Sequence, residues 1–168
     1  MKFIQSAFTI MTLSACLTVG DREINSGNSP VLGIFTGITP CGQFIRPLHK
    51  VSREGDCALV QWRLTLHQDP VSFKPTTYKL SSVNRFIVEG TNMYSEPGTT
   101  SETEGKWTIV RGTKTNYNSI TYRLESDKPQ KSISFLKLGN SLIHLLDTDG
   151  KLMIGNESFS YTLSRVAN

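Results

Sequence analysis

The chain has 168 residues, of which 38% are hydrophobic and 19% are charged, and this composition suits one globular domain of ordinary size. Its formal net charge is +4 at neutral pH, but the lysines and arginines are spread singly along the sequence. They form neither a basic cluster nor a stripe that alternates with aromatic residues. This distribution argues against nucleic acid as a partner.

Residues 1–15 have the layout of a secretory signal peptide, because one basic residue, Lys2, precedes a largely apolar run and then small residues. The apolar run is roughly half of the ~20 residues that a helix needs to cross a bilayer. The sequence LSAC, which ends at Cys16, resembles the lipobox of bacterial lipoproteins, in which the chain is cleaved before the cysteine and the cysteine is acylated. We therefore expect lipidation at Cys16. A secreted protein that is cleaved elsewhere, with Cys16 incidental, is the alternative.

The residues after Cys16 indicate where such a lipoprotein would reside. In the rule for enteric bacteria an aspartate at the next position retains the protein in the inner membrane, whereas here Leu17 follows. We expect an outer-membrane lipoprotein whose domain lies in the periplasm or at the cell surface. Residues 16–30 mix Gly, Asn, Ser and Pro with little apolar periodicity, which predicts a flexible tether between the lipid and the domain.

From residue 31 onward the pattern changes to a period of two, which is typical of strands with one buried face. In the segment 58–68, ALVQWRLTLHQ, apolar residues from Val60 to Leu66 alternate with polar ones. No segment of the domain shows a helical stripe. Strands are expected at 32–38, 58–67, 76–81, 84–90, 104–111, 119–125, 132–138, 141–146, 151–155 and 158–165.

Turn residues divide the second half of the domain. Gly139-Asn140 and the Asp147 to Gly150 turn predict a three-strand meander over residues 132–155, and the loop 91–104 is predicted to be a mobile segment at the rim. A single antiparallel sheet of about eight strands tends to close, because closure removes its exposed edges. The predicted fold is therefore all-β, a small antiparallel β-barrel over residues 31–168. A barrel of this size is filled by side chains or holds one small ligand.

Four short motifs occur in a recognisable order. They are GIFTGITPC at 33–41, the strand at 58–66, EGKWTI at 104–109 and LIHLLDTDGKLM at 142–153. Together they resemble the N-terminal domain of the copper-resistance lipoprotein NlpE and its relatives, over roughly residues 31–165. The resemblance implies a lipocalin-like barrel with a non-enzymatic sensing or interaction role, linked to envelope stress, surface contact or copper tolerance. It also implies an envelope protein as partner.

The cysteines depart from the family pattern. The family has Pro-Cys-x-x-Cys, but Phe44 stands where the second cysteine is expected, and Cys57 directly precedes the strand at 58–66. The resemblance therefore implies that Cys41 and Cys57 are spatial neighbours that bracket an insertion. With Cys16 acylated, two cysteines remain in an oxidising compartment, which favours a disulfide worth about 3 kcal/mol. A metal or redox site and two free thiols are the alternatives.

A copper ion would have only weak candidate ligands in this sequence. Thiolate, imidazole and thioether groups suit copper, and they are offered by Cys41, Cys57, His49, Met93 and Met153, but their spacing does not define a site. We therefore expect no resident cofactor.

The histidines are expected to have ordinary positions. His49 is predicted on a solvated loop, His67 on the exposed face of its strand, and His144 in the meander as a partly buried residue.

Catalytic motifs are missing from the sequence. There is no Gly-x-Ser-x-Gly elbow, no His-Glu-x-x-His pair and no glycine-rich phosphate loop, so we expect a protein that is not an enzyme. The alternative function is a lipocalin-like binder of a small apolar ligand, with Trp62 and Trp107 as walls of a cavity. In the other interpretation both tryptophans fill the core.

Overall fold

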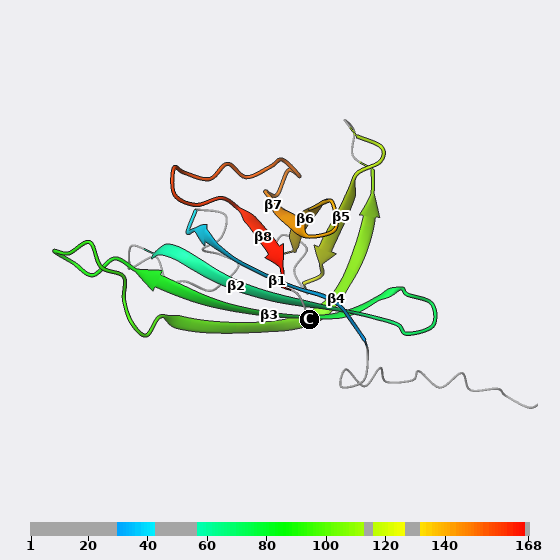
Figure 1. Ribbon diagram of the computed structural model, residues 1–168, viewed down its shortest axis with the longest axis horizontal. Coiled ribbons are helices and arrows are strands. Elements are labelled where there is room, and N and C mark those ends of the chain that lie inside the picture. The colour runs from blue at the N-terminus through cyan, green and yellow to red at the C-terminus, as the bar shows by residue number, and fades with distance from the viewer. Residues whose placement is uncertain (1–29, 43–56, 113–115, 127–131, 167–168) are drawn as a thin grey trace, which may run out of the picture.

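The computed structural model describes residues 30–42, 57–112, 116–126 and 132–166. Within these ranges eight antiparallel strands pair in sequence order and close into a barrel, with β8 beside β1 (Figure 1). The predicted class, a small all-β antiparallel barrel, is confirmed. No helix in these ranges is long and apolar enough to span a membrane. The strands are β1 (Val31–Pro40), β2 (Cys57–Gln68), β3 (Pro75–Phe86), β4 (Thr99–Arg111), β5 (Ile120–Leu124), β6 (Ile133–Leu138), β7 (Leu142–Leu146) and β8 (Thr162–Arg165).

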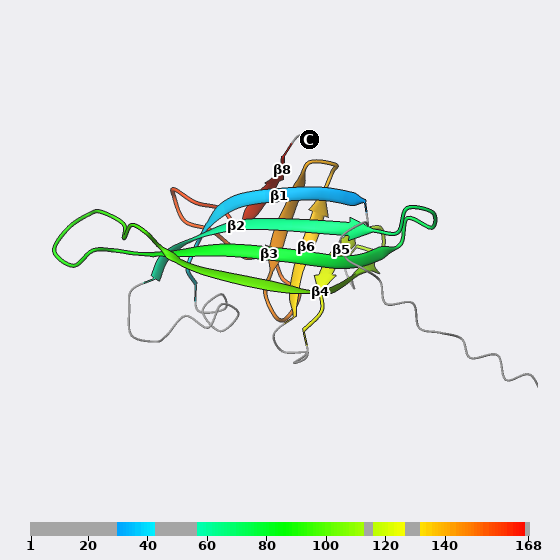
Figure 2. The same ribbon diagram turned by 90° about the horizontal axis from the view of Figure 1, so that it is seen from below.

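The barrel has a long layer and a short one. Strands β1 to β4 run side by side as the long layer, and the shorter strands β5 to β8 lie across part of it (Figures 1 and 2). Because β1 to β4 are longer than the strands that cover them, the β3–β4 hairpin extends past the covered part.

The barrel closes where β1 meets β8. The two strands pair over only two positions, one of which places Phe35 opposite Arg165. A hydrogen bond of 2.8 Å from the N–H of Val166 to the carbonyl oxygen of Ile34 extends this pairing. At Gly37 an added Cβ would lie 2.9 Å from a main-chain oxygen of β8, so the close approach requires glycine.

The interior of the barrel is filled by side chains from every strand. The alternating residues of β2 behave as their period of two predicts, and Val60 to Leu66 supply four fully buried apolar side chains. The indole N–H of Trp62 donates a 2.9 Å hydrogen bond to the hydroxyl of Thr39, and the Trp62 ring meets Phe135 edge to face with centroids 6.4 Å apart. Such pairs add to the stabilisation that burial provides.

Strand β4 changes partner along its length. Residues 99–106 pair only with β3, and residues 107–111 pair only with β5. At the change, the indole N–H of Trp107 donates a 2.8 Å hydrogen bond to the carbonyl oxygen of His67, and its ring lies edge to face against Tyr122 at 5.2 Å. Trp107 therefore fixes the corner at which β4 leaves the long layer.

Two predicted strands and one predicted loop in the middle of the chain were wrong in their bounds. The segments 76–81 and 84–86 belong to one continuous strand, β3, because the small residues Ser81 and Ser82 pair within the sheet instead of forming a turn, and residues 87–90 lie beyond its end. The predicted loop 91–104 is wrong for residues 99–104, which begin β4.

The end of the predicted meander also differs. Residues 151–155 form no strand, and only a single bridge joins Leu152 to Leu146. The last predicted strand, 158–165, shortens to β8, because residues 156–159 form a turn around the Asn156 side chain.

We predict that Phe135→Ala lowers the free energy of unfolding by about 3–5 kcal/mol, because it empties the centre of a filled core. Chemical denaturation would measure the change. Tyr117→Ala, at an exposed turn, is the matched control and should stay within about 0.5 kcal/mol of the wild type. Equal losses for the two variants would contradict the packing described above.

Candidate functional site

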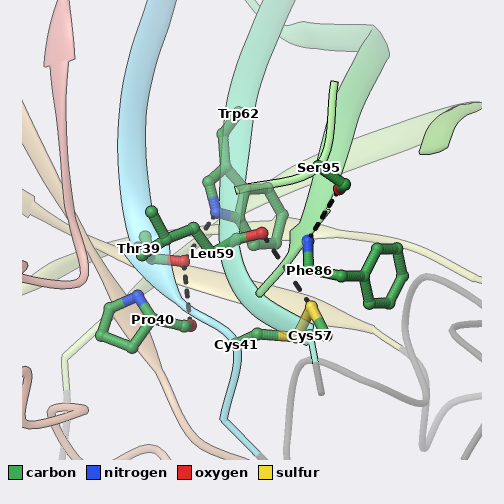
Figure 3. The surroundings of a disulfide bond; sticks show 8 residues. All are labelled: Thr39, Pro40, Cys41, Cys57, Leu59, Trp62, Phe86 and Ser95. Atoms are coloured by element: carbon green, nitrogen blue, oxygen red, sulfur yellow. Dashed lines mark hydrogen bonds between the residues drawn. A yellow bond between two sulfur atoms is a disulfide. The ribbon is translucent and has the colours of Figure 1, made fainter. Parts of the chain in front are cut away.

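Cys41 and Cys57 lie together at one end of the barrel. Cys41 directly follows β1 and Cys57 is the first residue of β2, with their Cα atoms 5.6 Å apart and their sulfur atoms at disulfide-bonding distance (Figure 3). The sheet itself brings them together, because the N–H of Cys41 donates a 2.9 Å hydrogen bond to the carbonyl oxygen of Ala58. The two residues are thus the spatial neighbours that the resemblance implied.

The disulfide end is closed by a tyrosine. Tyr161 precedes β8 and its phenol oxygen accepts a hydrogen bond from the N–H of Gly42. Burial raises the pKa of the Tyr161 phenol, and the Gly42 hydrogen bond offsets part of that shift. A Cβ on Gly42 would lie 2.8 Å from the phenol oxygen, so a larger residue would displace the ring. The tyrosine is held neutral as a packing group.

His144 is partly buried, as predicted, and both of its ring nitrogens make contacts. Its Nε2 lies 2.9 Å from the carbonyl oxygen of Met153 and its Nδ1 lies 2.9 Å from the hydroxyl of Thr162. Because a carbonyl can only accept, a neutral His144 carries its hydrogen on Nε2 and accepts from Thr162 on Nδ1. Both ring nitrogens are occupied, so the imidazole is not available to a ligand without a rearrangement.

His67 lies far from the cysteines. It is near the end of β2 and is half-buried, and its carbonyl oxygen binds the indole of Trp107. Cys57 begins the same strand, so the length of β2 separates the two residues.

The structure describes four of the weak copper candidates, Cys41, Cys57, Met93 and Met153. Cys41 and Cys57 lie at disulfide-bonding distance, Met153 packs against the core, and Met93 is exposed in the loop after β3. No cluster of three or more His, Cys, Asp or Glu side chains occurs in the part of the chain that the structure describes. Cys16 and His49 lie outside the described residues.

The side chains that could have lined a ligand cavity are packed together instead. Trp62, Leu64, Trp107, Phe135 and Tyr161 are each at most 5% exposed and belong to one core cluster. A ligand inside the barrel would therefore have to displace them.

The interior becomes polar toward the disulfide end. Thr39, Ser82 and Asn84 are each at most 2% exposed there, and the side-chain oxygen of Asn84 has no hydrogen-bond partner. An unsatisfied buried oxygen of this kind is normally compensated by water. These residues were not predicted to be buried, because small polar side chains at alternating positions of a strand, such as Ser82 and Asn84 of β3, are typical of an outer face.

The extension of β3 and β4 is the other feature that the sequence reasoning missed. Beyond Phe86 the hairpin continues through a bridge between Ile87 and Tyr94 and a 2.9 Å hydrogen bond from the N–H of Val88 to the carbonyl oxygen of Met93. Four apolar side chains are exposed here, those of Ile87, Val88, Met93 and Tyr94. The signal in the sequence was the turn EGTN between the pairs Ile87-Val88 and Met93-Tyr94.

A shallow groove of about 770 Å³ lies on the outer face of the short layer. Arg123 of β5, Ser134 of β6 and the turn that follows β7 line it. Of the predicted site residues that the structure describes, Cys41 and Cys57, neither borders this groove.

Comparison with protein-family models, with curated proteins and with solved structures found no significant match.

We predict that the double variant Cys41→Ala with Cys57→Ala keeps the barrel and loses at most about 3 kcal/mol of unfolding free energy, because β1 and β2 remain paired beside both positions. Denaturation and the far-ultraviolet spectrum would measure stability and strand content.

Thiol counting on denatured, unreduced mature protein separates the disulfide from a metal site. We expect no reactive thiol from Cys41 or Cys57, and no change in melting temperature with Cu(I). Two reactive thiols, together with a copper-dependent rise in melting temperature that both Cys→Ser variants abolish, would overturn the disulfide interpretation.

Proposed function

We propose that this protein is an outer-membrane lipoprotein anchored through Cys16, whose barrel is a non-enzymatic interaction domain similar to the N-terminal domain of the NlpE family. The sequence LSAC and the order of the four motifs over residues 31–165 support the proposal. Envelope stress, surface contact and copper tolerance are the processes that the resemblance implies.

The shape of the barrel is the observation that carries the interaction role. The interior is occupied by core side chains, while the β3–β4 hairpin projects beyond the covered part of the sheet (Figure 2). Exposed apolar side chains at such a tip lose contact with water when a partner covers them, which favours association.

One edge of the extension is open to a further strand. Residues 99–104 of β4 pair with β3 on one side, and no described strand pairs with them on the other. Most of their side chains are exposed on both faces of the sheet. An extended segment of another protein could add to this edge through main-chain hydrogen bonds, a common mode of peptide recognition.

Charge on the edge indicates the chemistry of that segment. The carboxylates of Glu102 and Glu104 lie 3.4 and 3.7 Å from the ammonium of Lys79. One positive charge is therefore shared by two negative charges, and this group of three is net negative. Pairing with a second copy along the same edge would bring these acids together, and like charges across strands are destabilising. A partner strand that carries Lys or Arg fits this edge best.

The alternative, a small apolar ligand inside the barrel, has less support. Trp62 and Trp107 are buried in the core, so a ligand could enter the barrel only by displacing packed side chains. Protein interiors are close-packed, and inserting an extra group into one lowers the stability by about 1–3 kcal/mol or more.

We predict that metabolic labelling with a fatty acid marks the wild-type protein and not Cys16→Ala, because acylation requires that sulfur. The mature wild-type chain should also begin at Cys16. Equal labelling of the two proteins, or no labelling of either, would reject the anchor.

We predict that a photo-crosslinker placed at Met93 forms a discrete adduct with an envelope protein in intact cells. Ile154 is the matched control, because it is also highly exposed and lies outside the extension. Replacing Glu102 and Glu104 with lysine should weaken the Met93 adduct about tenfold or more, since it opposes a cationic partner. Equal adducts from Met93 and Ile154, or an adduct insensitive to the charge reversal, would count against the interaction role.

A further inference from the structure

The turn between β2 and β3 presents two apolar side chains to solvent. Val71 is 84% exposed and Phe73 is 69% exposed, and both lie in the short segment 69–74. Large side chains with so much exposure are unusual at a turn tip, where small polar residues predominate.

The turn is held in one conformation by Asp69. Its carboxylate accepts hydrogen bonds from the N–H of Ser72 at 2.7 Å, the hydroxyl of Ser72 at 2.9 Å and the N–H of Val71 at 3.0 Å. These bonds from Ser72 and Val71 lower the pKa of Asp69, so the carboxylate is charged and already satisfied within the turn. The main chain of Asp69 also bonds Phe73 and Lys74, at 3.0 and 2.8 Å.

The backbone of Phe73 lies in the left-handed region, with φ of 55°. Glycine or asparagine adopts this conformation readily, whereas a bulky aromatic residue does so only at a conformational cost. The fold alone would favour Gly or Asn at this position. An exposed phenylalanine in this unfavourable conformation therefore points to a use for its side chain.

The turn lies beside the point where the chain enters the barrel. The N–H of Gln68 donates a 3.0 Å hydrogen bond to the carbonyl oxygen of Pro30, the first described residue. In both views the β2–β3 turn and the start of β1 are at the same end of the sheet, and the β3–β4 tip is at the other (Figures 1 and 2). A chain anchored at Cys16 therefore reaches the barrel at the end that carries Val71 and Phe73.

We propose that the β2–β3 turn, through Val71 and Phe73, inserts into the lipid surface to which the chain is anchored and so orients the barrel on the membrane. The inference rests on the proposed anchor at Cys16. The residues from Cys16 to Pro30 span at most about 50 Å when fully extended. A tether of this length allows the turn to reach the bilayer but does not hold it there.

Lipid is the occupant that these features fit. Two apolar side chains at a narrow tip can insert between lipid headgroups, because apolar groups bind at the boundary between headgroups and acyl chains at a depth of about 5–10 Å. The neighbouring Lys74 is exposed and can direct its ammonium to lipid phosphates while its stem follows the apolar surface. Asp69 has its hydrogen bonds made within the turn, which reduces the penalty when water is withdrawn.

The test uses full-length lipidated protein in vesicles of phosphatidylethanolamine and phosphatidylglycerol with brominated acyl chains, which quench only tryptophans that contact them. The two native tryptophans are buried and give the background. We expect the brominated lipids to quench the emission of Phe73→Trp. The quenching of Met93→Trp should not exceed the background, although the native Met93 has the same exposed fraction as Phe73 and lies at the other end of the sheet. Co-flotation with the vesicles reports the anchor separately.

A second variant excludes misfolding as an explanation. Phe73→Asn suits the left-handed backbone, so its melting temperature should not fall, yet it should abolish the quenching of a Val71→Trp reporter. Flotation without quenching at Phe73→Trp would overturn the orienting turn and leave the anchor intact. Failure to float would overturn both. Quenching of Phe73→Trp and Met93→Trp to the same extent would also reject the proposal, because the barrel would then have no preferred orientation.

Discussion

The change of partner in β4 at Trp107 is the constraint on which the rest of the structure depends. The indole is held by the carbonyl oxygen of His67 from one side and by the ring of Tyr122 from another, so the strand bends at a fixed point. Beyond this corner β4 pairs with β5, the first strand of the short layer that covers the core. Before it, β4 pairs with β3 alone and is left as an extension. One buried residue thus separates the closed part of the molecule from its open edge.

Because the interior of the barrel is filled, a binding site is more readily formed on its surface than inside it. In a barrel of eight strands the same inward positions can either surround a ligand or fill the space, and here large aromatic side chains such as Trp62 and Phe135 fill it. Their edge-to-face contact fixes both rings, so a cavity would require the loss of that contact as well as of buried area. The proposed partner would therefore contact the exposed side chains at the ends of the strands and the uncovered edge of β4.

The sequence allowed the barrel to be predicted, since strands with one buried face carry a period of two, as in β2. It did not allow the extension to be predicted, because residues 99–104 are polar on both faces and such a segment resembles a loop. The strand forms there because threonines favour extended backbone and β3 supplies hydrogen bonds along one side. The cysteine pair could be placed only by analogy, since no period relates Cys41 to Cys57; the register of β1 with β2 brings them together.

The two ends of the long layer have different characters, and the connectivity explains why. Antiparallel strands alternate in direction, so the start of β1 and the β2–β3 turn must share one end, while the disulfide and the β3–β4 loop must share the other. Each end exposes apolar side chains, but only the first adjoins the entry point of the chain at Pro30. A domain tethered at that entry point would have its apolar β3–β4 tip on the side away from the tether, where a protein partner is more accessible than lipid. The order of the strands, rather than any single side chain, therefore places two apolar surfaces at opposite ends of the sheet, and only under the proposed anchor would they face different partners.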